Sequence, residues 1–192
     1  MKVSPGWIDS LGLHVWLVPR WHWRLAPPAF KERLPESVKD KVPSPAMWRP
    51  ARLRHIDHID PSGIRWRRGR GVIGRCWLRR QAISFSLQAD WGAYRDYDAK
   101  QWKALRRDPK FRHVTMKLNF EQFQRMQSLY SEVLAVPIYK QRESGNRYLV
   151  GCVVADMPAL KDGQSPRFSI LNSTFETLLR TCAAQLEDRI KA

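Results

Sequence analysis

The residues best suited to chemistry in this chain are three cysteines and one short run of acids and histidine. Cys76, Cys152 and Cys182 are an odd and scattered set, with neither the paired spacing of a zinc site nor a disulfide framework. Such cysteines are typical of buried apolar thiols in a reducing compartment. Asp57-His58-Ile59-Asp60 contains metal-ligating residue types, but it lies between an expected strand and a Pro-Ser-Gly turn, where polar residues are routine. We therefore expect no metal site.

Signatures of catalysis are also missing from the sequence. There is no nucleophile-elbow motif, no cysteine-protease signature and no Walker-type phosphate loop. Gly69, Gly71 and Gly74 superficially match the dinucleotide-binding fingerprint. However, Arg65 to Arg68 does not read as a buried parallel strand, and no following βαβ unit supplies an acid for a ribose. We expect no catalytic residues and interpret the chain as a protein that is not an enzyme.

The same glycines predict a closely packed local structure. From Arg70 to Trp77, a glycine, two β-branched residues and a second glycine indicate a tight turn that leads into a short helix. Glycine suits this position because it alone allows one backbone to approach another so closely. The apolar residues of this helix share one face: Val72, Ile73, Cys76 and Trp77. Arg75 and Arg79 lie on the adjacent face.

Apolar patterning predicts strands on either side of this helix. Leu11 to Val18 is largely apolar on both faces, as in a central strand that is covered on both sides. His14 within it is expected to be a hydrogen-bonded core or pocket residue, because no other ligand type sits at metal spacing beside it. Ala51 to His55 predicts a half-buried strand with a cationic outer face, and Ile83 to Leu87 shows the most regular alternation.

Three further helices are expected in the second half of the chain. Asp98 to Arg106 predicts a mobile helical excursion within an aromatic-rich and charged stretch. Asn119 with Gln122 three residues on indicates a helix start, and Ser173 with Glu176 predicts a capping box for the last helix. Apolar residues recur along that last helix at three- and four-residue steps: Phe175, Leu178, Leu179, Cys182, Leu186 and Ile190.

Two segments resemble the GAF family of small-molecule sensor domains. Gly69 to Trp77 is similar to the family's Gly-x-Gly-x-x-Gly-x-hydrophobic segment. At a GAF-like distance follows a predicted hairpin of residues 133–138 and 148–156, joined by a turn at 143–146. It looks like the GAF hairpin, whose first strand ends in apolar-Pro-apolar and whose second strand carries a glycine.

The resemblance implies an α/β (α+β) sandwich. We expect a mainly antiparallel sheet of five to six strands, with terminal helices on one face and with the glycine helix and residues 90–114 on the other. The chain reads as a single domain over residues 1–192 that ends in a helix at 170–192. A Pro-rich, basic insertion at residues 20–50 departs from the family pattern and is open to interpretation as a lid, a docking arm or a tether.

The resemblance also implies a ligand beneath residues 90–114. The expected contacts are Cys76, Trp77, Phe85, Trp91, Tyr94 and Asp156. The cofactor or ligand stays unidentified, because the residue series of cyclic-nucleotide-binding members is absent and the setting of Cys76 does not match that of bilin-binding members. GAF members that reduce free methionine sulfoxide with pocket cysteines offer an enzymatic alternative, since Cys76 and Cys152 lie on elements that can approach each other.

Charge is the other distinctive property of the sequence. The formal net charge is +16, and between Arg20 and Arg80 there are sixteen Lys or Arg against five acids. This stretch interleaves the arginines with tryptophans, a combination that suits an interface with phosphate or carboxylate. The residues expected to dock an anion are Arg20, Arg24, Arg67 and Arg68. Nucleic acid, an acidic membrane surface and an acidic protein all remain open as partners.

Together these features predict a non-catalytic, GAF-like regulatory domain that binds a small molecule or a protein partner in signalling. The alternative is a nucleic-acid-binding or acidic-membrane-docking module that uses the basic segment. A homodimer through the C-terminal helix is left open. The longest apolar run near the start spans eight residues, far short of the ~20 needed to cross a bilayer, so we expect a cytoplasmic protein.

Overall fold

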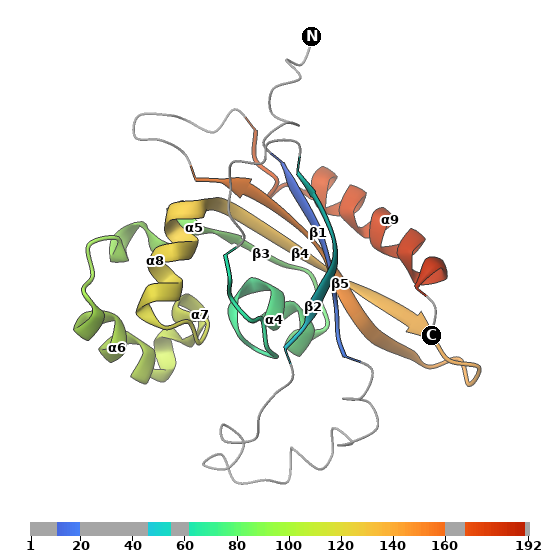
Figure 1. The fold of residues 1–192 in the computed structure, drawn as a ribbon, viewed down its shortest axis with the longest axis horizontal. Helices are drawn as coiled ribbons and strands as arrows, with labels where there is room; N and C mark the ends of the chain where they lie inside the picture. Colours follow the sequence, from blue (N-terminus) through green and yellow to red (C-terminus); the bar gives the residue numbers. More distant parts are fainter. Residues whose placement is uncertain (1–10, 20–45, 55–61, 160–167, 191–192) are drawn as a thin grey trace, which may run out of the picture.

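The computed structural model describes residues 11–19, 46–54, 62–159 and 168–190 and has a mixed α+β fold (Figure 1). Its strands form one open sheet in the order β2-β1-β5-β4-β3, with every neighbouring pair antiparallel. The described residues thus confirm the α+β class and an antiparallel sheet of five strands. The strands are β1 (Gly12–Leu17), β2 (Trp48–Arg54), β3 (Ile83–Ser86), β4 (Tyr130–Gln141) and β5 (Arg147–Pro158).

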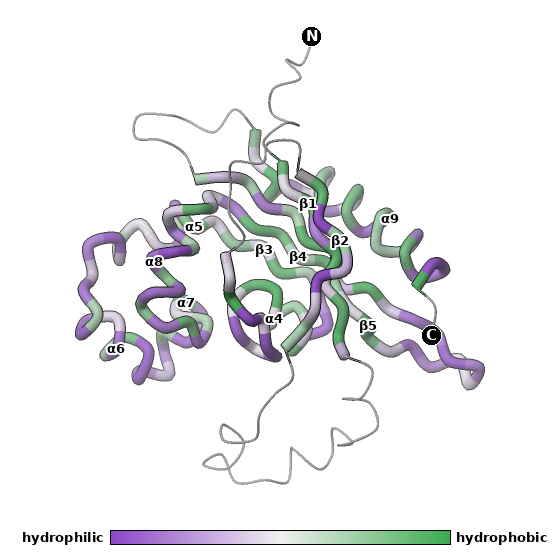
Figure 2. Tube along the Cα trace, viewed as in Figure 1, coloured by the Kyte–Doolittle hydropathy of each residue, from purple (hydrophilic) through white to green (hydrophobic). Residues whose placement is uncertain are grey.

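Helices cover the two faces of this sheet unequally (Figure 1). On one face α9 packs against β4 and β5, and on the other lie α4 and the group from α5 to α8. Figure 2 shows the strands mostly apolar where they pass between these layers, as burial on both faces requires. The helices are α4 (Gly71–Arg79), α5 (Leu87–Trp91), α6 (Ala99–Arg107), α7 (Arg112–Thr115), α8 (Phe120–Leu129) and α9 (Ser173–Arg189), with 3-10 turns at η2 (Gly92–Tyr94) and η3 (Pro109–Phe111).

The long hairpin of β4 and β5 forms the centre of the sheet. Its turn closes with hydrogen bonds from the Arg142 amide to the Asn146 carbonyl and from the Gly145 amide to the Arg142 carbonyl, both 2.9 Å long. This confirms the predicted hairpin and its turn. Both strands extend beyond the predicted apolar residues, because antiparallel pairing continues through polar positions near the turn, where Lys140 faces Tyr148.

Helix α4 confirms the prediction made from the glycines. The apolar face of α4 is buried, and two glycines allow the helix to lie close to the segment that precedes it. Gly71 has a positive φ of 62°, and the Trp66 ring occupies the space that a β-carbon there would need. Gly74 lies directly against the Arg67 carbonyl. The C-cap residue Arg80 has a left-handed backbone conformation, and its amide donates a hydrogen bond of 2.8 Å to the Cys76 carbonyl.

The segment from α5 to α8 packs around a cluster of fully buried aromatic rings. Trp102 of α6 stacks on Phe123 of α8, with 3.9 Å between ring centroids and 18° between planes, and Trp91 meets Phe123 edge-on at 5.0 Å. Each indole also finds a backbone acceptor: Trp91 Nε1 donates to the Val114 carbonyl at 2.9 Å, and Trp102 Nε1 to the Leu118 carbonyl at 3.0 Å. The predicted helical excursion therefore contributes Trp102 and Leu105 to the hydrophobic core on this face of the sheet.

Capping residues set several element boundaries. The predicted capping box of Asn119 and Gln122 is confirmed, with hydrogen bonds of 2.8 and 3.1 Å. The predicted strand over residues 83–87 ends one residue earlier, because the Ser86 hydroxyl accepts from the Ala89 amide and begins α5. At these positions the element boundary is set by a side chain that accepts a hydrogen bond from a free helix amide, and not by the alternation of apolar residues.

The predicted capping box of the last helix was wrong by one residue. The Asn172 side chain, not Ser173, accepts from the Phe175 amide at 2.8 Å. Glu176 is thereby free to pair with Arg180 one turn further along. Asn172 has an extended backbone, as an N-cap residue does, so Ser173 already belongs to the helix.

The apolar stripe of α9 is also narrower than predicted. Phe175 and Leu179 are buried against the sheet together with Ala183, whereas the side chain of Leu178 is 57% exposed. Cys182, Leu186 and Ile190 are intermediate. None of the described helices combines the length and the apolar character needed to cross a bilayer.

Candidate ligand-binding site

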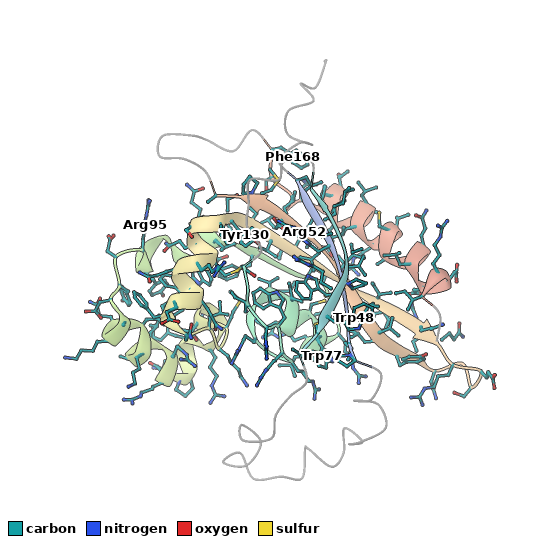
Figure 3. The ribbon with its side chains drawn as sticks, viewed as in Figure 1. Trp48, Arg52, Trp77, Arg95, Tyr130 and Phe168 are labelled. Carbon is teal, nitrogen blue, oxygen red and sulfur yellow. The ribbon has the colours of Figure 1, made fainter. Side chains whose placement is uncertain are left out.

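A cleft lies over the face of the sheet that α4 and α8 cover. The cleft is shallow and small: its cavity volume is about 30 Å³, within about 330 Å³ of space that includes the solvent at its mouth. Its residues come from four strands, two helices and the segment before α4: His14, Trp16, Arg49, Ser62, Trp66, Ile73, Met126, Tyr130, Val133, Val154 and Asp156. Figure 3 shows Tyr130, at the start of β4, and Arg52, on β2, near this region of the sheet. The cleft thus joins a few polar groups to an apolar wall, which is usual for small-molecule sites.

Strand register brings His14 and Asp156 together in this cleft. His14 of β1 lies opposite Val154 of β5, so Asp156, two residues further along, lies on the same face one step away. His14 Nε2 forms a short contact with Asp156 Oδ2, and both side chains are 5% exposed. A buried carboxylate is costly unless it is paired, and the imidazole supplies that pairing. The prediction that His14 is a hydrogen-bonded core or pocket residue is confirmed.

Two polar atoms in this cleft have no hydrogen-bond partner among the described residues. They are Nδ1 of His14 and Nε1 of Trp16, and both are inaccessible to solvent. Trp16 is two positions after His14 along β1, so their side chains point to the same face of the sheet. Buried polar groups are normally satisfied, and an unpaired one costs roughly 1–3 kcal/mol. Both residues line the cleft, but solvent does not reach either atom, so a bound molecule must displace neighbouring side chains to pair with it.

Arginines of the edge strand β2 give the cleft a positive charge. Arg49 places its guanidinium over the Trp16 ring, 5.3 Å from the centroid. Burial lowers the pKa of Arg49, and the nearby charge of Arg52 lowers it further, whereas Tyr130 and Asp156 partly offset these effects. Arg52 pairs in register with His14 on the neighbouring strand. Arg49 and Arg52 thus add positive charge beside the buried pair of His14 and Asp156.

The structure separates the residues that were predicted to contact a ligand. Asp156 lines the cleft, but Phe85 and Trp91 pack edge-on at 5.2 Å within the aromatic core. Trp77 is buried on α4, and Tyr94 meets Tyr97 edge-on at 5.2 Å near the periphery. The sixth predicted residue, Cys76, is fully buried. Under the predicted roof of residues 90–114, the described side chains form packed core.

Cys76 and Cys152 do approach each other, as the sequence allowed. Both thiols are free and fully buried. Burial raises the pKa of the Cys152 thiol well above its ordinary value, and the neighbouring Cys76 thiol adds to this effect. A thiol that stays protonated and out of reach of solvent is a poor nucleophile.

A second charged feature surrounds the start of α4. Burial lowers the pKa of Arg70, and the like charges of Arg67 and Arg106 lower it further, so these three guanidinium groups form one cationic cluster. Arg75 donates through Nη1 to the His113 carbonyl at 2.9 Å beside it. Figure 3 shows nitrogen-tipped side chains gathered around α4 and its neighbouring helices.

The structure reaches only some of the predicted docking and metal residues. Arg67 and Arg68 lie in the segment before α4, whereas Arg20, Arg24 and most of the insertion at residues 20–50 fall outside the described residues. The acid–histidine run at residues 57–60 falls outside them too. In the part of the chain that the structure describes, no three His, Cys, Asp or Glu side chains gather closely enough to hold a metal ion.

Sequence reasoning missed Trp16 and Arg49 and found His14 and Asp156 only separately. A signal existed: His14 and Trp16 place polar atoms on one face of a strand that otherwise reads as apolar. The pairing of β1 with both β2 and β5, which the sequence does not encode locally, was needed to recognise that these residues share a site. Comparison of the chain with known proteins finds no match among family models, curated proteins or solved structures.

Proposed function

We propose that this protein is a non-catalytic regulatory domain that binds a small molecule in the cleft over β1, β2 and β5. The observation that carries the proposal is the buried His14–Asp156 pair in the lining of that cleft, together with two buried atoms of lining residues that have no hydrogen-bond partner, Nδ1 of His14 and Nε1 of Trp16. Leaving two buried polar atoms unpaired is costly, and a ligand that pairs them recovers this cost on binding. Part of the favourable free energy of ligand binding would therefore come from relieving this cost.

The sequence resemblance supports the sensor role. The glycine helix and the hairpin that resemble GAF segments become α4 and β4–β5, and both border the cleft through Ile73 and Val133. The cleft lies between a rigid sheet and helices α4 and α8, so a ligand there contacts both layers. Occupancy of such a site can be passed to a partner as a change in how the helices pack on the sheet.

The test is ligand-dependent stabilisation with a matched pair of tryptophan variants. Nucleotides, amino acids, small organic acids, haem and flavin are screened by thermal shift, because a ligand at 100-fold its dissociation constant adds about 2.7 kcal/mol of stability. Trp16→Ala should abolish the stabilisation by any compound that binds the cleft. Trp48→Ala removes a neighbouring indole that is 53% exposed and lies outside the cleft, so it should leave the stabilisation intact. A compound that stabilises both variants equally binds elsewhere and contradicts the proposed site.

A second candidate function rests on the arginine cluster before α4. Burial is the main cause of the lowered pKa of Arg70, and the like charges of Arg67 and Arg106 lower it further. A polyanion reduces the electrostatic repulsion within such a cluster, because it can neutralise several guanidinium groups together. We infer an anion-docking surface here, with nucleic acid and an acidic membrane as the two partners to be compared. It does not compete with the cleft, because the two sites share none of these residues.

A further inference from the structure

Resting on the ligand-binding function proposed above, we propose that the ligand of the cleft is a small organic carboxylate, held by Trp16, Arg49 and His14. The inference concerns the chemical class that these three side chains recognise. It follows from the hydrogen-bonding roles they offer, from the balance of charge and from the apolar wall behind them.

The free polar atoms of the cleft are mainly donors. The indole of Trp16 has one N–H and no acceptor, and the guanidinium of Arg49 has only donors. His14 contacts Asp156 through Nε2, so Nδ1 donates when the ring carries both protons and accepts when it carries one. A ligand group with two acceptor oxygens satisfies Trp16 and Arg49 together and favours the doubly protonated ring.

The charges that face His14 favour an anion over a neutral ligand. From β2 come Arg49 and Arg52, from β5 comes Asp156, and Tyr130 contributes a phenol from the start of β4. The side chains that α4 and α8 contribute, Ile73 and Met126, are apolar. Asp156 is already engaged by the imidazole, so the guanidinium of Arg49 has no anion of its own among the residues that line the cleft. A bound carboxylate supplies that counter-charge.

The surroundings favour a carboxylate over a phosphate. Phosphate sites usually present several backbone amides from a glycine-rich loop or a helix N-terminus. Here β1 is paired on both edges, with β2 and with β5, so its backbone amides are committed to the sheet. The rest of the wall is apolar or aromatic, from Trp66, Ile73 and Met126. Such a wall suits a hydrocarbon or aromatic group attached to the carboxylate.

Binding of the anion should bring one proton from solvent to His14. A carboxylate beside an unprotonated Nδ1 places two acceptors face to face, which is repulsive. Uptake of a proton at Nδ1 turns this contact into a charge-assisted N–H···O⁻ hydrogen bond, while Nε2–H remains on Asp156. Two guanidinium groups and one imidazolium then face two carboxylates beside the phenol of Tyr130, so one net positive charge remains.

The experiment compares benzoate with benzamide, which have the same shape but differ in charge. Binding to the full chain is measured by calorimetry in two buffers of different ionisation enthalpy, and the imidazole ¹⁵N resonances are recorded with and without benzoate. The variants are Trp16→Phe, which keeps the ring and removes Nε1–H, and Arg49→Gln. The matched control is Arg142→Gln, because Arg142 also lies over an aromatic ring, that of Tyr148, but far from the cleft.

The proposal expects benzoate to bind and benzamide to bind at least about tenfold more weakly, since hydrogen bonds to charged groups are roughly twice as strong as neutral ones. Trp16→Phe and Arg49→Gln should each weaken benzoate about tenfold or more, which is the loss expected for one charge-assisted hydrogen bond. Arg142→Gln should have no effect. The buffers should reveal uptake of a proton, and one histidine should move to the ¹⁵N shifts of a doubly protonated ring.

Other outcomes overturn the inference in distinguishable ways. Equal binding of benzoate and benzamide, or benzoate binding that Arg49→Gln leaves unchanged, rejects the carboxylate but leaves a ligand-binding cleft in place. Preference for inorganic phosphate over every carboxylate does the same. If neither probe binds and no compound of the broader screen stabilises wild type in a Trp16-dependent manner, the proposed function fails together with the inference.

Discussion

Gly74 of α4 lies so close to Arg67 that a β-carbon on it would come within 3.0 Å of the Arg67 carbonyl oxygen, nearer than real β-carbons come to any atom. The same turn is closed by hydrogen bonds from the Gly69 amide to the Gly74 carbonyl and from the Gly74 amide to the Arg70 carbonyl. The obstacle is backbone, which cannot rotate aside as a side chain can. We therefore expect Gly74→Ala to destabilise the protein by about 3 kcal/mol or more, at the upper end of what overpacking costs.

Gly92→Ala is the matched control for this prediction. No atom lies within 4 Å of a β-carbon at Gly92, and its φ of −53° suits any residue. Alanine there should be neutral, or stabilising by up to about 1 kcal/mol, because it restricts the unfolded chain. Urea denaturation of both variants measures the difference. Equal stabilities would show that the backbone at Gly74 can move away, contrary to the close packing described here.

A second prediction tests whether the aromatic cluster is core. Trp102 is almost fully buried, stacks on Phe123 and donates to the Leu118 carbonyl. Trp102→Ala should therefore lower the free energy of unfolding by about 3–5 kcal/mol, as for other large aromatic truncations. Trp48→Ala, at an exposed position, should change it by less than about 1 kcal/mol. A stable Trp102→Ala variant that gained a ligand would instead support a pocket beneath residues 90–114.

These elements show what the sequence could and could not predict about the fold. Helix α4 was predictable because its signals are local: two glycines in a tight turn and an apolar face at helical spacing. The hairpin of β4 and β5 was predictable for the same reason. The start of α9 was misplaced because Asn172 and Ser173 are both good N-caps, and only the backbone conformation of Asn172 decides between them.

The site was harder to predict than the fold, because its residues are distant in sequence. His14 and Asp156 are separated by 142 positions and meet only through the pairing of β1 with β5. Phe85 and Trp91 were predicted to contact a ligand, but they pack edge-on against each other and are buried, and neither lines the cleft. Composition alone does not distinguish these two uses of an aromatic ring.

The paired cysteines give a prediction about reactivity. Cys76 and Cys152 are fully buried, whereas Cys182 on α9 is partly exposed. Alkylation of the folded protein near neutral pH should therefore modify Cys182 first and leave the other two unmodified until the protein unfolds. A Cys182→Ser variant should show almost no rapid labelling. Fast modification of Cys76 in that variant would contradict its structural role and revive the enzymatic alternative.

The raised pKa of Cys152 also predicts how stability depends on pH. The folded thiol keeps its proton in a range where the unfolded thiol has lost it, so the unfolded state binds fewer protons there. The contribution is complete below the ordinary pKa of a thiol and is lost as the pH rises above it towards the folded value. Cys152→Ala should flatten this alkaline decline in the free energy of unfolding, as measured by urea denaturation at several pH values. An unchanged decline in the variant would assign it to other groups.

The cationic cluster gives a prediction about polyanions. Replacement of Arg67, Arg70 and Arg106 by Gln removes three charges that repel one another, so the melting temperature should not fall. If this surface docks a polyanion, binding at physiological salt should weaken strongly, and the salt dependence should become shallower by about 0.9 in log–log slope per lost phosphate contact of a DNA duplex.

The control for the cluster is a triple variant with the same net charge. Arg142, Arg180 and Arg189 are exposed arginines of the hairpin turn and of α9, and their replacement by Gln lowers the net charge equally. Both variants are tested against acidic vesicles and against duplex DNA. Equal weakening of the two variants would mean that only overall charge matters, and this would reject a defined surface. A preference of wild type for one polyanion identifies the partner class.

The His14–Asp156 pair gives the final prediction, a double-mutant cycle. His14→Leu leaves the Asp156 carboxylate buried without its imidazole partner, and Asp156→Val leaves the imidazole without its acceptor. Removing one member of a buried hydrogen-bonded pair leaves the other unsatisfied at a cost of about 1–3 kcal/mol, and more for a charged group, whereas replacing both members by apolar residues can be nearly neutral. The double variant should thus be clearly more stable than the sum of the single losses predicts, by about 1–3 kcal/mol of coupling. It should also have lost ligand binding, because Nδ1 is gone. Additive losses in urea denaturation would show that the two residues do not depend on each other, and ligand binding that survives in the double variant would remove His14 from the site.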